Sequence, residues 1–337
     1  MSVHSYFRRI RAAFSAGGLN LVLFKIEDKV FKTHYSSEYI YRIFEAATPQ
    51  EFPELVQDCV IMGTGRKFDI YNPQTFNEKI QWIKVFDSTP LKTRLADKYL
   101  VRDWITEKIG AEYLVPLLGV WDSFDDIDFN SLPNQFVLKC NHGSGWNIIV
   151  KDKSKLDLKE ARCKLESWIK KNYAFKRGEL QYLNIPPKII AEQYLENINQ
   201  LYDYKIMCFN GEPKFLWVDE DRFIKHKRSL FSLDWKPLPF KICEKYDSIS
   251  DPEKAKPESL DLMIDLARTL CQGFAHVRID FYAVDGKVYF GEMTFTSTSG
   301  LDRIVPEEWN NKIGNMLILP PKSPIPSRKR RNTDSLE

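Results

Sequence analysis

The segment AHVRIDFYAVDGKVYFGEMTF, residues 275–295, contains two apolar strands that flank an Asp-Gly pair. Alternation of side chains along the first strand places Arg278 and Asp280 on one face and apolar residues on the other. In the second strand, Glu292 and Thr294 share one face. Charged side chains in the middle of apolar strands are costly to bury unless they are paired or bind a metal ion. This hairpin is therefore the first candidate for a site of chemistry.

The length of the connecting loop determines whether the two carboxylates of this hairpin meet. A two-residue loop at Asp285-Gly286 would place Asp280 and Glu292 on opposite faces of the sheet. A three-residue loop that begins at Val284 would place both carboxylates on one face and collect the apolar side chains on the other. Because the second arrangement gives a consistent buried face, we predict the three-residue loop.

Two carboxylates on adjacent strands, with a threonine hydroxyl beside them, suit Mg²⁺. This ion takes one or two carboxylates and leaves the rest of its shell to phosphates and water. The predicted metal ligands are therefore Asp280, Glu292 and Thr294. The alternative is that Asp280 simply pairs with Arg278 or a nearby lysine, and the spacing alone leaves both interpretations open.

The segment KCNHGSGWN, residues 139–147, follows an apolar strand and precedes another. Its glycines, Gly143 and Gly145, would let backbone N–H groups approach phosphate oxygens, and Lys139 would add a positive charge. It is not a Walker A loop, which requires GxxxxGK[ST]. An ordinary glycine-rich connection is the alternative, and we interpret His142 as structural.

Three further acidic or basic positions lie on predicted strands or at their ends. Glu192 could present a carboxylate to a ribose, and Lys205 could contact a phosphate or pair with a carboxylate. Asp219 and Asp221 form a D-x-D pair, the form that metal-dependent glycosyltransferases use on sugar nucleotides. A short acidic turn after a strand is the more common interpretation of that pair.

The composition excludes several classes of protein. The chain has 337 residues, 43% hydrophobic and 28% charged, which is ordinary for a globular protein and excludes collagen, coiled coil and wholesale disorder. No apolar run approaches the roughly 20 residues of a membrane span. The basic excess lies in residues 1–32 and 320–337, so the body between them is net acidic and we expect no nucleic-acid partner. The basic ends could contact an anionic membrane surface.

The six cysteines form no CxxC pair, which predicts reduced thiols in a cytoplasmic protein. The basic ends of the chain predict peripheral contact with the inner face of the membrane. The N-terminus does not have the pattern of a secretory signal peptide. Helical patterns alternate with antiparallel hairpins, the clearest of them at Asn210-Gly211. This mixture predicts the α+β class.

Six motifs follow one another along the chain: FNEKIQWIKV, ADKYLVRDWI, FVLKCNHGSGWN, AEQYLE, DYKIMCFNGEPKFLWV and VRIDFYAVDGKVYFGEMTFTSTSG. In this order they resemble the ATP-grasp superfamily and, within it, the TupA-like proteins, which are similar to the teichuronopeptide-synthesis protein. The resemblance covers about residues 55–320. It implies two α+β lobes that sandwich ATP. The implied boundaries are a basic helical arm at 1–54, a pre-ATP-grasp region at 55–132, a small lobe at 133–198, a large lobe at 199–320 and a disordered basic tail at 321–337.

The resemblance also implies roles for individual residues. ATP would be held by Lys98, Lys139, Gly143, Ser144, Gly145, Glu192 and Lys205, and Mg²⁺ by Asp280 and Glu292. The superfamily usually has Glu-x-Asn where this chain has Glu292-Met293-Thr294, and a threonine hydroxyl is a weaker ligand. The predicted catalytic residues are Lys139 and Arg278. The predicted substrate residues are Arg228, Ser297, Ser299 and Gly300, the last three near backbone N–H groups that would hold an oxyanion.

The implied chemistry is ATP-dependent joining of a carboxylate to an amine through an acyl phosphate. The family context of cell-surface polysaccharide assembly (capsule, teichuronic acid or O-antigen) implies a uronic-acid substrate, which could be lipid-linked, and an amine donor. Two alternatives stay open. One is a glycosyltransferase that acts through Asp219 and Asp221, and the other is a non-catalytic scaffold that docks on a membrane through its basic ends.

Overall fold

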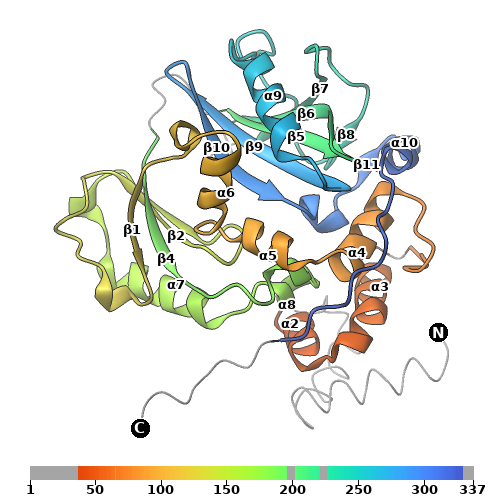
Figure 1. Cartoon of the computed structure of the whole chain (residues 1–337), viewed down its shortest axis with the longest axis horizontal. Coiled ribbons are helices and arrows are strands. Elements are labelled where there is room, and N and C mark those ends of the chain that lie inside the picture. Colours follow the sequence, from red (N-terminus) through yellow and green to blue (C-terminus); the bar gives the residue numbers. More distant parts are fainter. Residues whose placement is uncertain (1–36, 65, 196–201, 221–225, 329–337) are drawn as a thin grey trace.

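The computed structural model describes residues 37–64, 66–195, 202–220 and 226–328, drawn in colour in Figure 1. Residues 1–36 of the helical arm implied at 1–54, and Asp221 of the D-x-D pair, lie outside the described residues. Within them, helices and antiparallel sheets alternate, as the α+β class requires. In the described ranges, no helix has the length and apolar character needed to cross a membrane.

The smaller of the two main sheets has the strand order β1-β4-β2-β3, and all its pairs are antiparallel. Its strands are β1 (Leu117–Trp121), β2 (Phe136–Cys140), β3 (Asn147–Val150) and β4 (Ile189–Gln193). Helix α7 (Leu158–Lys170) begins at the N-cap Asp157, which accepts from the backbone N–H of Glu160 at 2.9 Å. Its buried Leu165 joins Phe136 and Leu138 in the core of this lobe.

The larger sheet has the order β10-β9-β5-β6-β7. Its strands are β5 (Asp203–Phe209), β6 (Glu212–Glu220), β7 (Lys227–Ser232), β9 (His276–Val284) and β10 (Lys287–Thr294). The predicted hairpin at Asn210-Gly211 is confirmed, since both residues have positive φ between β5 and β6. Helix α9 (Leu260–Leu270) covers one face of the sheet with its apolar side.

The opposite face of the larger sheet meets the helical part of the chain. Helix α4 (Phe76–Phe86) starts with a capping box, because Thr75 accepts from the N–H of Glu78 and Glu78 accepts from the N–H of Thr75. Two more helices follow α4 along the chain, α5 (Pro90–Ala96) and α6 (Val101–Lys108). The remaining longer elements are α2 (Ser37–Ala46), α3 (Phe52–Thr64), α8 (Ala174–Arg177), α10 (Glu308–Met316) and the short pair β8 (Lys241–Ile242) and β11 (Ile304–Val305).

The two sheets lie on either side of helices α5 and α6. Figure 1 shows the four-stranded sheet at the left, the five-stranded sheet at the top, and the two helices between them. Helices α2, α3 and α4 form a layer below, at the right. Strand β10 and the 3₁₀ turn Ala111–Tyr113, which follows α6, meet through the backbone bridge between Leu114 and Phe290. This bridge brings the segment that follows α6 to the edge of the larger sheet.

The hairpin of β9 and β10 differs from the prediction. Its loop has two residues, Asp285 and Gly286, both with positive φ, so the predicted three-residue loop is wrong. A β-bulge between Phe290 and Glu292 then shifts the register by one residue. After the bulge, Glu292 lies opposite Asp280, so the expected shared face is formed by the bulge and not by the loop.

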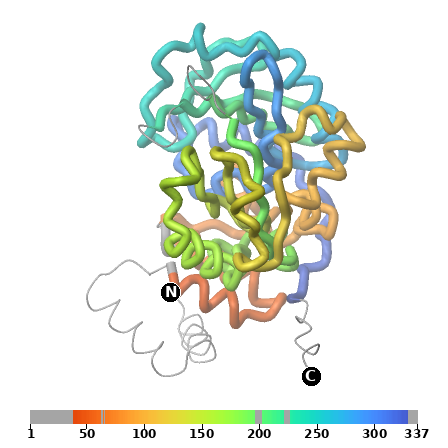
Figure 2. Tube along the Cα trace, turned by 90° about the vertical axis from the view of Figure 1, so that its left-hand side faces the viewer, coloured from red at the N-terminus to blue at the C-terminus, as the bar shows by residue number. Residues whose placement is uncertain are grey.

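The start of the predicted disordered tail is also different. Residues 321–328 run beside the helical layer, and Figure 2 shows the blue C-terminal segment descending past it. The backbone N–H of Ser323 donates to the carbonyl of Phe86 at 2.7 Å, and Asn184 Nδ2 donates to the carbonyl of Ser327 at 2.9 Å. Ile325 packs against the main hydrophobic core. Residues 329–337 lie outside the described residues.

Candidate active site

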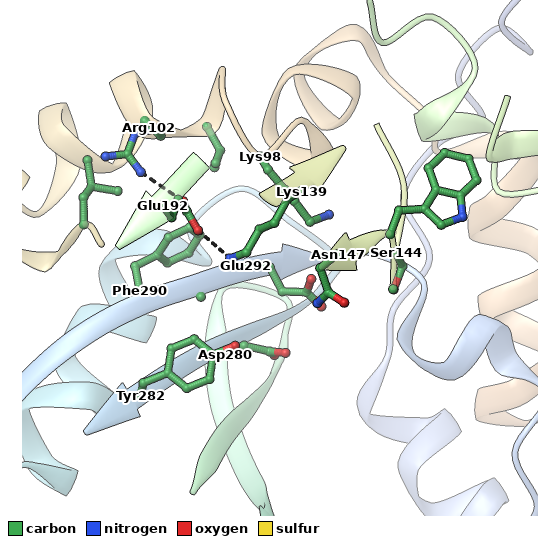
Figure 3. Close-up of a pocket in the computed structure, with 15 residues that line it drawn as sticks. Lys98, Arg102, Lys139, Ser144, Asn147, Glu192, Asp280, Tyr282, Phe290 and Glu292 are labelled. Carbon is green, nitrogen blue, oxygen red and sulfur yellow. Dashed lines mark hydrogen bonds and ion pairs between the residues drawn. The ribbon is translucent and has the colours of Figure 1, made fainter. Parts of the chain in front are cut away.

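A pocket opens where the two sheets face each other, and its lining is charged on both sides (Figure 3). The small lobe and the helices contribute Lys98, Arg102, Lys139, Ser144, Gly145, Asn147 and Glu192, and the larger sheet contributes Asp280, Tyr282, Phe290, Gly291 and Glu292. Most of the residues predicted to hold ATP and metal are therefore brought together from segments far apart in the sequence.

Glu192 on β4 is held by two cations. Lys139 Nζ on the adjacent strand β2 pairs with Oε2, and Arg102 Nη1 on α6 lies 3.2 Å from Oε1. Arg102 Nη2 also donates to the carbonyl of Val115 at 2.9 Å, which fixes the guanidinium. The sequence analysis missed Arg102. It lies at the start of α6 within the motif ADKYLVRDWI, and its place in that motif could have signalled it.

The glycine loop between β2 and β3 forms one wall of the pocket. Lys98 Nζ donates to the carbonyl of Gly143, which ties the loop to the helical region. Gly145 has φ +76°, and a Cβ there would meet no atom within 4 Å, so its backbone faces open space. Burial lowers the pKa of Lys98, and the nearby Glu292 carboxylate acts in the opposite direction.

His142 is structural, as predicted. It is buried, its Nδ1 contacts Asn141 Oδ1, and its Nε2 contacts the carbonyl oxygens of Trp168 and Lys171, each at 3.2 Å. These contacts connect the glycine loop to the end of α7.

Arg278 on β9 lies between the two carboxylates of the hairpin. Its Nε and Nη2 donate to the two oxygens of Asp280, each at 2.6 Å, and Nη2 also donates to Glu292 Oε1 at 2.8 Å. Thr294 Oγ1 donates to the same Glu292 oxygen at 2.7 Å. The four side chains form one cluster, in which Arg278 and Asp280 are buried and Glu292 is partly exposed, and its two carboxylates line the pocket.

The two carboxylates have different acidities. Burial raises the pKa of Asp280 to about 6, although Arg278 and Lys205 lower it. Burial also acts to raise the pKa of Glu292, but Arg278 and Lys98 outweigh it, and that pKa lies well below the usual range. Glu292 therefore stays ionised, while Asp280 is the carboxylate whose charge the site least favours.

The oxygen atoms of Asp280, Glu292 and Thr294 converge on the Arg278 guanidinium. This donor set contains only oxygen, and it includes the one or two carboxylates that Mg²⁺ takes when phosphates complete its shell. The residues present therefore fit that ion, and the pairing of Asp280 with Arg278, the alternative weighed from the sequence, is present as well. Across the described ranges, no group of three or more His, Cys, Asp or Glu could hold a metal ion by itself.

Lys205 and Asp219 lie behind this cluster on the larger sheet. Lys205 Nζ pairs with Asp203 and lies 3.3 Å from Asp280 Oδ2 and 3.7 Å from Asp219 Oδ2. Lys205 therefore supplies a positive charge to the acidic cluster and does not line the pocket. Asp219 accepts from Arg228 at 2.6 and 3.1 Å, so the first carboxylate of the D-x-D pair is already engaged.

Residues 297–300 are not in the pocket. Gln81 Nε2 on α4 donates to the carbonyls of Ser299 and Gly300, each at 2.9 Å, and Ser297 Oγ contacts His276. The N–H of Ser299 donates to the carbonyl of Thr296 at 2.8 Å. That N–H is engaged in a turn, so the predicted oxyanion site is not formed by it.

The pocket, the glycine loop and the acidic hairpin fit one known family. The family model described as TupA-like ATPgrasp matches residues 78–318, which is most of the chain. The chain belongs to the TupA-like ATP-grasp family. The family assignment and the ATP-grasp fold that the sequence predicted are thereby confirmed.

The solved structures to which this member of the TupA-like family is similar share little sequence with it. D-alanine–D-alanine ligase from Bacillus anthracis, solved with ATP, is 14% identical, with a TM-score of 0.35 over 60% of this chain and 54% of that one. The L-amino acid ligase from Bacillus licheniformis is 14% identical, with a TM-score of 0.39 over 63% and 46%. The N5-carboxyaminoimidazole synthetase from Staphylococcus aureus is 14% identical, with a TM-score of 0.37 over 78% and 57%. The chain thus spans about half the length of these structures. The curated proteins contain no sequence match.

Proposed function

We propose that this protein joins a carboxylate to an amine with consumption of ATP. The observation that carries the proposal is that the acid pair Asp280 and Glu292, bridged by Arg278, lines the same pocket as Lys139 and the glycine loop. A phosphate chain in the pocket would meet cations on one side and a metal-binding acid pair on the other. That arrangement suits phosphoryl transfer, in which positioning and charge neutralisation supply most of the catalysis.

Each wall of the pocket has a separate task in this proposal. Lys98, Lys139 and the backbone around Gly145 would hold the phosphates, and Glu192 would accept from the ribose hydroxyls. Asp280, Glu292 and Thr294 would hold Mg²⁺, which when bound neutralises phosphate charge and polarises the transferred group. Arg278 would then be free to face the oxygens of the transferred phosphoryl group.

The proposed reaction has two steps. A carboxylate oxygen of the substrate attacks the γ-phosphorus, the bond to the bridging oxygen breaks, and ADP leaves with that electron pair. The amine then attacks the carbonyl carbon of the acyl phosphate, loses a proton and expels inorganic phosphate to leave an amide. Repulsion between the substrate carboxylate and the phosphate chain is the main electrostatic obstacle to the first step. The positively charged residues of the pocket would reduce this repulsion.

We further propose that the acid is a uronic acid of a cell-surface polysaccharide and that the protein acts in the cytoplasm. This part is supported by the family resemblance alone. The glycosyltransferase alternative is disfavoured by one observation: Asp219, which that mechanism would use for metal, does not line the pocket that Asp280 and Glu292 line.

An isotope experiment tests the acyl-phosphate route. Full-length protein would be incubated with ATP, Mg²⁺ and a panel of uronic acids and amines, with ¹⁸O in the carboxylate. We expect ADP, an amide, and one ¹⁸O atom in the released phosphate by mass spectrometry. Glu292→Gln should lose all three products, whereas the exposed control Glu166→Gln should retain them. Amide formation without ¹⁸O in phosphate would contradict the mechanism.

A further inference from the structure

The guanidinium of Arg228 on β7 has a donor that the proposed reaction does not use. Arg228 is 8% exposed, and its Nε and Nη2 donate to the two oxygens of Asp219. In the described part of the chain, the buried Nη1 atom has no hydrogen-bond partner. Buried donors in folded proteins are almost always paired, so an unpaired one needs an explanation.

Two aromatic rings fix the orientation of this guanidinium. The ring centroid of Trp217 lies 4.5 Å from Arg228 Cζ, and that of Tyr246 lies 4.9 Å away. A planar guanidinium that stacks on rings and pairs along one edge presents its remaining N–H groups in a fixed direction. The Nη1 group is therefore preorganised to donate to an acceptor other than Asp219.

Arg228 lies on the same face of the larger sheet as the acidic cluster. It is opposite Asp219 in the β6–β7 register, and Asp219 is opposite Asp203 in the β5–β6 register. Trp217 contacts both guanidinium groups, since its centroid lies 5.3 Å from Arg278 Cζ and 4.5 Å from Arg228 Cζ. Arg228 is thus one indole ring away from the group that holds Asp280 and Glu292.

Two further side chains, His226 and Asp302, lie beside the Arg228–Asp219 pair. Asp219 is contacted by Arg228 and by His226, whose Nε2 lies 2.9 Å from Oδ1. The nearest acid on the Nη1 side is Asp302, whose Oδ2 is 4.0 Å away and outside hydrogen-bond range. The Asp302 side chain is 32% exposed, so solvent reaches this carboxylate beside the buried Nη1.

We propose that Arg228 Nη1 binds a second anionic group on the acid substrate. The inference rests on the proposed function, because it assumes that the reacting carboxylate lies at Arg278. It narrows the substrate class to acids that carry another carboxylate or a phosphate beside the carboxylate that is joined. An acid without a second anionic group would leave the Nη1 group of Arg228 without a hydrogen-bond acceptor.

Calorimetry on the full chain in the presence of Mg²⁺ and ADP tests this class. The probes are butyrate, glutarate and 4-phosphonobutyrate, which carry no second anion, a carboxylate and a phosphonate respectively. We expect at least one of the two dianionic acids to bind tenfold or more tightly than butyrate. Preference for glutarate identifies a carboxylate as the second group, and preference for 4-phosphonobutyrate identifies a phosphate. Equal affinity for all three acids would overturn the inference.

Three variants connect the preference to Arg228. Arg228→Lys keeps a cation beside Asp219 but removes the guanidinium and its Nη1 donor. The preference for dianionic acids over butyrate should therefore fall to less than threefold. Asp302→Asn removes the carboxylate near Nη1, so dianion affinity should increase, and this result does not depend on the folding of the first variant. The exposed neighbour Arg303→Gln is the matched control and should behave like the wild type.

The same experiment separates this inference from the proposed function. Normal binding of Mg²⁺ and ADP without a preference for dianions would overturn the role of Arg228 and leave the ligase proposal intact. Failure of the wild-type protein to bind ADP would contradict the ligase proposal itself.

Discussion

Asp280 and Glu292 lie directly opposite each other in the β9–β10 register, although the two-residue turn that joins their strands would place them on opposite faces. The extra residue is Gly291, and a Cβ there would lie 3.1 Å from the carbonyl oxygen of Asp280. The acid pair of the pocket therefore depends on a bulge that only a small residue fits well. Arg278, which bridges the pair, makes the two carboxylates one electrostatic unit.

The first prediction concerns that unit. Asp280→Asn and Glu292→Gln each keep the size of the side chain and remove one negative charge. We expect each variant to lose ATP turnover, because an ion bound here would lose a charged ligand. Turnover should be measured as ADP release, and circular dichroism should show that the fold is retained. Wild-type turnover in both variants would exclude these carboxylates as metal ligands.

The second prediction concerns Lys139. Its ammonium pairs with Glu192 at the wall of the pocket, and Arg102 still neutralises that carboxylate when the lysine is removed. We therefore expect Lys139→Ala to weaken ATP binding by about 1.5–3 kcal/mol with little change in the melting temperature. Lys164→Ala is the control, since Lys164 forms only an exposed helix pair with Glu160. Normal ATP affinity together with early melting would show that Lys139 is structural.

The sequence predicted the elements of this site better than their relative placement. The hairpin at Asn210-Gly211 and the polar face with Asp280 follow from local rules of turn chemistry and side-chain alternation. The β-bulge could not be predicted in this way. A two-residue loop followed by a one-residue bulge places Asp280 and Glu292 on the same face as a three-residue loop without a bulge would.

Two other features needed the tertiary structure. Residues 297–300 have the composition of an exposed loop, but Gln81 supplies donors to the carbonyls of Ser299 and Gly300 from a distant helix. Likewise, Arg102 reaches Glu192 only because α6 lies between the two sheets. Contacts between segments this far apart in sequence leave no periodic pattern to detect.

The third prediction concerns pH. His276 is buried, its Nδ1–H donates to the carbonyl of Cys208 at 3.0 Å, and its Nε2 accepts from Ser297. Burial lowers the pKa of His276 to about 3, so the folded protein keeps it neutral while the unfolded chain takes up a proton below pH 6.5. The stability contribution is complete above pH 6.5 and decreases as the pH falls from 6.5 toward 3.

Urea unfolding of the wild type and His276→Gln at pH 7 and pH 5 measures this contribution. The wild type should lose about 2 kcal/mol more unfolding free energy than the variant over that interval. An equal loss in both proteins would mean that the histidine titrates alike in the folded and unfolded states.

The fourth prediction concerns Gly300, which has φ +60°. A Cβ at this position would lie 2.6 Å from Gln81 Nε2 and 2.9 Å from the carbonyl oxygen of Asn77. Gly300→Ala should therefore destabilise the fold by about 1–3 kcal/mol beyond the cost of the left-handed backbone. Gly286→Ala isolates the backbone term, because Gly286 has φ +75° and open space around it. If chemical denaturation gives similar losses of unfolding free energy for the two variants, Gln81 and Asn77 of α4 move to accommodate the added methyl group at little cost.

The last prediction concerns the segment that follows α10. Ile325 packs against the main core, whereas Ile318, seven residues earlier, is 72% exposed. The same Ile→Ser substitution at the two positions therefore separates the effect of burial on stability from the effect of the residue change itself. We expect Ile325→Ser to lower the unfolding free energy by about 1–2 kcal/mol, since part of an apolar side chain loses its contacts, and Ile318→Ser to change it by less than about 0.5 kcal/mol. Thermal and urea unfolding of both variants would measure the difference. If Ile325→Ser is as stable as Ile318→Ser, the packing of Ile325 against the core contributes no more to stability than an exposed isoleucine does.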